Sequence, residues 1–492
     1  MPTQRNPWLA LGALVVGFFM ILLDVTIVAV ANPAIMADLH ADISSVIWVT
    51  SAYLLTYAVP LLITGRLGDR FGPKNIYLIG LTVFTLASLW CGLSGDIEAL
   101  IAARAVQGLG AALMTPQTMA VITRTFPPDG RGAAMGLWGA VAGLATLIGP
   151  ILGGVLVDGL GWEWIFIVNV PVGIVAFVLA VWLVPSLPTH EHKFDLLGVV
   201  LSATGMFLLV FGIQEGNAND WSVTIWSMIG AGLAVLAVFL VTQARGSGEP
   251  LLPLSLFRDR NFSMSTLAIA SMGAATTAVM VPIYFYLQAV HGMTPTRSAL
   301  VLAPMAILSG VAAPVVGKLS GRWHPRLIPT TGFLLFALAV AWLALVMRNP
   351  HANITWMVLG GAVAGLSNAF IWAPLATTAT HNLPIHQAGA GAGVYNTTRQ
   401  VGAVLGSAAI SALVASRMSA QGLGGAPAGE GMGAGQVPEP VQQPFSTALS
   451  EATFLPAVLL LVGVVASALF IRHPTAGPAG PAETPKADSL TR

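Results

Sequence analysis

Charge is what this sequence has least of. Only 8% of its 492 residues are Asp, Glu, Lys or Arg, whereas 55% are hydrophobic. A soluble globular protein usually carries about 25% charged residues, so a chain this long would fail to cover its surface in water. Apolar runs of about 18 residues or more recur along the chain, and each is typical of a membrane-spanning helix. The composition therefore excludes a soluble protein and predicts an all-α integral membrane protein, since barrel strands would be shorter and would alternate.

Other absences exclude most kinds of chemistry. The single cysteine, Cys91, excludes an intrachain disulfide and a cysteine-based metal cluster. The sequence contains no GxxxxGK[ST] loop for ATP, no HExxH and no GxSxG. A net charge of +1 indicates no nucleic-acid partner. The histidines of HEHK (190–193) are expected to lie in a solvated cytoplasmic loop and not to bind metal. We therefore expect no enzyme activity, no cofactor and no metal, and an ion gradient remains as the source of energy.

The distribution of Lys and Arg residues predicts which side of the membrane each loop faces. With a cytoplasmic N-terminus, most of the 21 Lys and Arg residues fall in inner loops, as membrane topology requires. Only Arg297, Arg348 and Arg417 fall outside, and Arg104 and Arg399 fall within spans. Both termini are then cytoplasmic. The predicted spans lie near 8–31, 46–65, 75–94, 98–124, 132–156, 162–184, 196–215, 223–243, 262–290, 296–318, 327–347, 354–380, 388–416 and 452–472.

Short motifs repeat about half a chain apart. GRLGDRFGPK (65–74) is matched by GKLSGRWHPR (317–326), and GLGAALMTP (108–116) by GLSNAFIWAP (365–374). Parallel repeats are typical of rocking transporters, although chance similarity among Gly- and Ala-rich helices is the alternative. We predict an N-terminal six-helix bundle (1–190), two inserted helices (191–250), a C-terminal six-helix bundle (251–475) and a disordered cytoplasmic tail (476–492).

Several segments together resemble the major facilitator superfamily, and within it the fourteen-span drug:proton antiporters. They are LLDVTIVAVANP (22–33), GRLGDRFGPK (65–74), RAVQGLGAALMTP (104–116), GLATLIGPILGG (143–154), WEWIFIVNVPVG (162–173) and NTTRQVGAVLG (396–406). The resemblance implies the major facilitator fold, multi-pass in the bacterial inner (plasma) membrane. It also implies multidrug efflux, and hence antibiotic resistance, driven by inward proton flow.

Two charges inside the spans are candidates for proton coupling. Buried charges in membranes are costly and usually pair or line a polar cavity. Asp24 lies roughly 13 Å below the outer end of its span and Arg104 roughly 9 Å below the outer end of another, at 1.5 Å per residue. The matching depths suggest that Arg104 stabilises the charge of Asp24. The alternative is that Arg104 bonds only to backbone carbonyls and holds helices together.

Two glycine-rich segments have roles that the resemblance implies. Gly65, Asp69, Arg70 and Gly72 would form a conformational latch between the halves, although basic inner loops alone also satisfy topology. The antiporter motif would form a hinge or a seal against proton leak, and close helix packing with a kink at proline is its alternative. This motif comprises Gly143, Gly149, Pro150, Gly153 and Gly154.

Polar or aromatic side chains in other spans are candidates for the substrate cavity. They are Gln107, Asn396, Arg399 and Tyr284. Asn396 and Arg399 belong to a polar cluster that is expected to face the interior. Arg399 would then line the substrate path or pair with a carboxylate, whereas polar bonding between helices is an even alternative.

These features predict a proton-coupled antiporter that exports lipophilic drug-like compounds by alternating access. Its partners would be small lipophilic molecules, protons and membrane lipid, and it is expected to act as a monomer. A lipid or lipid-precursor transporter on the same scaffold is the main alternative. A proton-coupled nutrient importer and a membrane-embedded enzyme are two others.

Overall fold

The chain folds as a bundle of long helices, seen in a computed structural model that describes residues 6–126, 128–189, 195–216, 219–245, 251–320, 324–380, 388–423 and 437–471. Within these ranges there are helices and no strands. The first half holds α1 (Pro7–Asp38), α2 (Ile43–Ala58), α3 (Leu61–Phe71), α4 (Pro73–Gly92), α5 (Ile97–Thr125), α6 (Pro128–Leu160), α7 (Trp164–Ile167) and α8 (Asn169–Leu183). Next come α9 (Leu196–Gln214), α10 (Val223–Arg245) and the 3₁₀ helix η1 (Leu254–Arg258). The second half holds α11 (Arg260–Phe285), the π-helix η2 (Tyr286–Val290), α12 (Pro295–Ser320), α13 (Leu327–Met347), α14 (Ile354–Ala369), α15 (Trp372–Thr380), α16 (Ala388–Ala420) and α17 (Glu439–Ala468).

Helices of membrane-spanning length account for most of the bundle. In the described part of the chain, twelve helices are long and apolar enough to cross a membrane. The predicted spans 46–65 and 132–156 fall on α2 with α3 and on α6, where the apolar stretches are shorter. Each predicted span thus coincides with helix. The count of fourteen crossings stays a prediction.

The inner motif and the start of the last helix differ from the prediction. The motif at 65–74 was expected as an inner loop, but α3 continues to Phe71 and only Gly72 interrupts the helices. Gly72 has φ +90°, which favours glycine because a side chain is rarely tolerated there. The last helix begins at Glu439, well before the predicted 452. The predicted tail at 476–492 lies outside the described residues.

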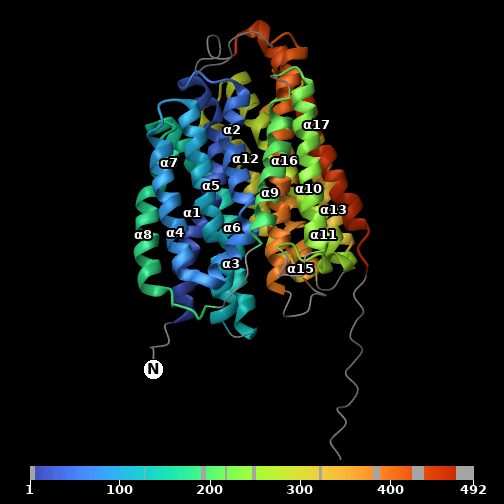
Figure 1. Ribbon diagram of the computed structural model, residues 1–492. Helices are drawn as coiled ribbons and strands as arrows, with labels where there is room; N and C mark the ends of the chain where they lie inside the picture. The colour runs from blue at the N-terminus through green and yellow to red at the C-terminus, as the bar shows by residue number, and fades with distance from the viewer. Residues whose placement is uncertain are drawn as a thin grey trace, which may run out of the picture.

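The helices gather into two groups, coloured blue to teal and green to red in Figure 1. In the first group α1 packs against α6 and α8, and α5 packs against α2 and α4. In the second group α11 packs against α16 and α17, and α12 packs against α14. The groups meet along two seams, α6 with α12 and α2 with α16. The middle pair, α9 and α10, pack on each other, and α9 also contacts α16 and α2.

Two polar contacts between the groups lie toward one end of the bundle. We call the end where α1 begins the inner end, following the predicted topology, and the other the outer end. Gln288 Nε2 donates to the carbonyl of Val30 at 2.9 Å. The Thr296 amide donates to Asp158 Oδ2 at 3.0 Å, across the seam of α6 and α12. These bonds join the groups close to the outer ends of their helices.

Candidate functional site

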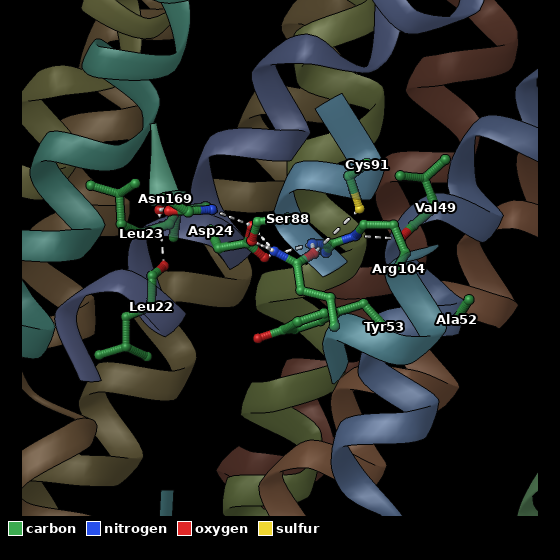
Figure 2. A network of polar contacts seen from close by, with 12 residues as sticks. Leu22, Leu23, Asp24, Val49, Ala52, Tyr53, Ser88, Cys91, Arg104 and Asn169 are labelled. Carbon is green, nitrogen blue, oxygen red and sulfur yellow. Dashed lines mark hydrogen bonds and ion pairs between the residues drawn. The ribbon is translucent and has the colours of Figure 1, made fainter. Parts of the chain in front are cut away.

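A carboxylate lies inside the first helix, where every neighbouring residue in the sequence is apolar or small. Asp24 occupies the middle of α1 and is completely buried. An isolated buried carboxylate is strongly disfavoured, so its charge must be balanced within the protein. Figure 2 shows that polar side chains converge on this carboxylate from neighbouring helices.

Arg104 of α5 supplies the compensating charge. Its Nη1 lies 2.5 Å from Asp24 Oδ2, and its side chain is 1% exposed. Nη1 also donates to Gln107 Oε1, and Nε donates to the carbonyl of Val49 on α2 at 3.0 Å. The guanidinium therefore bonds to the carboxylate as well as to backbone, and the alternative that it bonds only to backbone carbonyls is wrong. A buried charge pair is stabilising only when its remaining donors and acceptors are satisfied in this way.

Amide groups satisfy the other carboxylate oxygen. Asp24 Oδ1 accepts from Gln107 Nε2 at 2.9 Å and from Asn169 Nδ2 at 3.2 Å. Gln107 Nε2 also donates to Ser88 Oγ at 2.7 Å. The Cys91 thiol donates to Gln107 Oε1 at 3.8 Å. Helices α1, α4, α5 and α8 are thus linked through one carboxylate, and hydrogen bonds to charged groups are among the stronger ones in proteins.

Aromatic rings exclude water from the ion pair. The guanidinium carbon of Arg104 lies 4.1 Å from the ring centroid of Tyr53 and 5.6 Å from that of Phe166. Both rings are completely buried. A cation over a desolvated ring face is stabilised by the ring quadrupole. The same apolar shell strengthens every electrostatic interaction inside it, so a proton on Asp24 would change the local energy strongly.

The structure shows the contacts of one predicted residue, Gln107, and brings further residues to the ion pair. Gln107 was expected to line the substrate cavity, but it is completely buried and its amide is bonded on both atoms. Sequence reasoning did not single out Asn169, Ser88 or Tyr53. Asn169 had a signal, because it is a lone amide in the apolar segment WIFIVNVPV. Its partner was not visible in the sequence.

The antiporter motif packs directly beside Asp24. A Cβ at Gly149 would meet the side chain of Thr26, and a Cβ at Gly153 would lie 2.6 Å from the side chain of Ile27. A Cβ at Gly154 would lie 2.5 Å from Thr296 Cα of α12. Close backbone approach of this kind is how membrane helices associate. The motif therefore brings α6 against both α1 and α12. Gly143 and Pro150 also lie within α6, and the side chains around Gly143 are not described.

The remaining candidates lie elsewhere. Gly65 and Asp69 are in α3 and Gly72 ends it, while the side chain of Asp69 is not described. Arg70 is exposed, with its guanidinium 5.4 Å from the ring centroid of Phe71. Tyr284 lies near the outer end of α11, 1% exposed. Asn396 and Arg399 are half-buried on α16.

Metal binding has no support among the described residues. No group of three or more His, Cys, Asp or Glu side chains there is arranged to hold an ion. The HEHK segment lies outside the described residues, so its expected lack of metal stays a prediction.

Comparisons with known proteins agree with this architecture. The sequence profile of the Major Facilitator Superfamily matches residues 14–407. The chain is 53% identical to an uncharacterized MFS-type transporter of Mycobacterium tuberculosis, over 95% of this chain and 81% of that protein. It is 37% identical to the tetracenomycin C resistance and export protein of Streptomyces glaucescens, over 84% and 77%. Multidrug resistance protein Stp of M. tuberculosis is 32% identical, over 85% and 78%.

A solved structure has the same fold. It is a bacterial homolog of the human lysosomal transporter Spinster in an inward-facing and occupied conformation, with a TM-score of 0.66. The match covers 93% of this chain and 95% of the other at 16% identity, so it bears on the fold alone. With the family profile spanning most of the chain, the protein belongs to the major facilitator superfamily of transporters and is a multi-pass protein of the bacterial plasma membrane.

Proposed function

We propose that this protein is a proton-driven antiporter that exports lipophilic drug-like compounds. The observation that carries the proposal is the ion pair of Asp24 and Arg104, completely buried between α1 and α5. Among the buried residues of the described chain, Asp24 is the one acidic side chain. Buried ionisable groups in membrane helices are typical of proton relays. The names of two relatives, a tetracenomycin C resistance and export protein and a multidrug resistance protein, support export of drugs.

Protonation of Asp24 is the coupling step in this proposal. A proton on Oδ2 cancels the charge that Arg104 balances and turns that oxygen from an acceptor into a donor, whereas Oδ1 still accepts from the amides of Gln107 and Asn169. Arg104 then retains only the Gln107 oxygen and the Val49 carbonyl among its present partners. A buried charge left without its counter-ion is strongly unfavourable. The protonated state therefore favours a different arrangement of α1 against α5.

The antiporter motif carries this rearrangement to the outer seam. Gly149 and Gly153 contact Thr26 and Ile27, within one helical turn of Asp24. On the same helix Gly154 contacts Thr296 across the seam between the halves. A shift of α1 thus changes the packing that keeps the outer end closed. Rocking of the two bundles about a central site is the motion that parallel-repeat transporters use.

Other expectations from the sequence are proposed in the same framework. The two bundles at 1–190 and 251–475 would be the moving bodies, with fourteen crossings and both termini inside. Gly65, Asp69, Arg70 and Gly72 would act as the latch at the inner end. The protein would act as a monomer.

Replacement of the coupling acid tests the proposal. Asp24→Asn keeps the side-chain size and removes the proton site. In proteoliposomes that are acidic on the outer side, we expect substrate transport driven by the proton gradient to be lost while substrate binding remains. Asp220→Asn is the control, because Asp220 is exposed and its φ of +49° suits asparagine. Normal gradient-driven transport by Asp24→Asn would contradict the proposal. Offering a labelled lipid as cargo in the same proteoliposomes tests the alternative that the protein transports lipid.

A further inference from the structure

Arg399 is a half-buried cation without a counter-ion in the described chain. It lies on α16, inside a predicted span. Among the residues that the structure describes, no carboxylate forms an ion pair with it, and its guanidinium carbon lies 5.9 Å from the ring centroid of Trp372. Arg104, by contrast, has its carboxylate at 2.5 Å. An uncompensated cation at this depth is costly and normally marks a pathway or a ligand.

Close packing of two helices fixes the position of this cation. A Cβ at Gly273 of α11 would collide with the carbonyl oxygen of Arg399, and one at Gly402 would collide with that of Ala270. Gly406 meets the backbone of Ala274 in the same way. The backbones of α11 and α16 are therefore in direct contact at Arg399 and over the two turns that follow it. A side chain presented from a rigid helix pair is suited to hold a ligand in one geometry.

Two buried phenol groups on α16 and its neighbour α2 have no hydrogen-bond partner in the described chain. Tyr53 and Tyr57 lie on α2, and Tyr395 lies on α16, the helix that carries Arg399. Tyr57 is bonded to Thr115 at 2.9 Å, whereas the hydroxyls of Tyr53 and Tyr395 are buried and have no hydrogen-bond partner in the described chain. Buried polar groups are almost always satisfied, so each exception needs an explanation. A ligand that accepts hydrogen bonds supplies one.

The cluster bridges the two halves of the protein. Tyr395 precedes Arg399 by one helical turn, so both side chains lie on the same face of α16. Tyr53 comes from α2, which packs against α16, and Ser51 Oγ and Ser407 Oγ are 2.7 Å apart in that seam. A ligand held here would touch both bundles. That is the position from which a bound molecule biases the rocking motion between them.

We propose that Arg399, Tyr395 and Tyr53 form the binding site for an aromatic organic anion. A carboxylate or phenolate of the ligand would pair with Arg399 and accept from the two free hydroxyls, while its ring packs against tyrosine and Trp372. Lipophilic cations are disfavoured, because Asp24, the one buried acid among the described residues, is already engaged by Arg104, Gln107 and Asn169. The inference rests on the proposed function for its direction of transport and names the substrate class.

Equilibrium binding of a matched pair of probes tests the site. Pyrenebutyric acid and its methyl ester share a ring system and differ in charge. We expect the purified wild-type protein in nanodiscs to bind the acid at least about tenfold more tightly, as one charged hydrogen-bond partner contributes about 1.5–3 kcal/mol. Arg399→Gln should remove this preference and leave ester binding unchanged. Arg417→Gln is the control, since Arg417 lies on the same helix but is exposed and paired with Glu451 at 3.4 Å.

Three results would overturn the inference. They are equal affinity of the wild-type protein for acid and ester, an unchanged preference in Arg399→Gln, and equal weakening of both probes in that variant, which would indicate a purely structural arginine. If Arg399→Gln fails to fold, Tyr395→Phe decides, with an expected loss of about three- to tenfold for the acid alone. Binding is measured without a gradient, so these outcomes are independent of whether Asp24→Asn abolishes proton coupling.

Discussion

The carboxylate of Asp24 on α1 and the guanidinium of Arg104 on α5 lie 2.5 Å apart, with side chains 0% and 1% exposed. Residues 80 apart in the chain thus form a single charged unit inside the first bundle. Its second oxygen ties α8 and, through Gln107, α4 to the same unit. The pair is a structural joint of four helices as well as the proposed proton site, which leads to the first prediction.

Removal of only one charge should destabilise the protein more than removal of both. Arg104→Gln leaves a buried carboxylate without its cation, and losing one partner of a buried pair costs about 3–5 kcal/mol. We expect a marked fall in melting temperature in nanodiscs, and substantial recovery in the double variant Asp24→Asn/Arg104→Gln. Arg417→Gln, which breaks an exposed pair, should change the melting temperature little. A double variant as unstable as Arg104→Gln would show that the two charges are not coupled.

An added methyl group at the outer seam should open it. The Cβ of Gly154→Ala would lie 2.5 Å from Thr296 Cα. Because Thr296 Cα is a backbone atom, a change of side-chain rotamer cannot relieve this clash, and the two helices must move apart. We expect faster labelling by a membrane-impermeant maleimide at a cysteine introduced by Ser298→Cys, because Ser298 is completely buried at this end of α12. Gly159→Ala is the matched control, since a Cβ there would meet nothing within 4 Å. Equal labelling in both variants would argue against the seam as the outer gate.

Acidity at the outer end should weaken the fold through His291. Burial, with a smaller contribution from the charge of His351, lowers the pKa of His291 below its usual 6.5. Its Nε2 is buried without a partner in the described chain, and its ring packs edge-on against Tyr286. A histidine with a lowered folded pKa binds fewer protons when folded, so its contribution to stability is present above the unfolded pKa and is lost as the pH falls.

We therefore expect the melting temperature of the wild-type protein to fall between about pH 7.5 and about pH 5.5, and to fall less in His291→Gln. His40→Asn is the control, because His40 is exposed at the same end and its φ of +50° suits asparagine. Glu439 and His351 line the same open outer pocket of ≈ 720 Å³ as His291. An identical pH profile in His291→Gln would rule out this source.

The prediction of Asp24 and Arg104 as partners succeeded because depth is readable from sequence. Helices cross the membrane at a nearly constant rise, so residue number converts to depth. The contribution of Asn169 was not predictable in this way. It depends on the direction in which α8 turns its side chains, and no periodic pattern marks that direction in a helix that is apolar all round. The motif at 65–74 was predicted as a loop because its ten residues are rich in glycine and charge. Only Gly72 among them has a backbone conformation, with positive φ, that interrupts a helix.

The lipid environment, the all-helical class and the approximate spans followed from the amino-acid order alone, because they depend on the free energy of placing apolar and charged groups in lipid and water. The sequence also identified which spans contain polar side chains. Which of these side chains have hydrogen-bond partners became visible only in the packed bundle. Gln107 and Arg399 are both polar residues in apolar helices, yet Gln107 is bonded on both amide atoms while Arg399 has no carboxylate partner in the described chain. Hydrogen bonds require contact within about 3 Å and a defined direction, and only the packing of whole helices sets both.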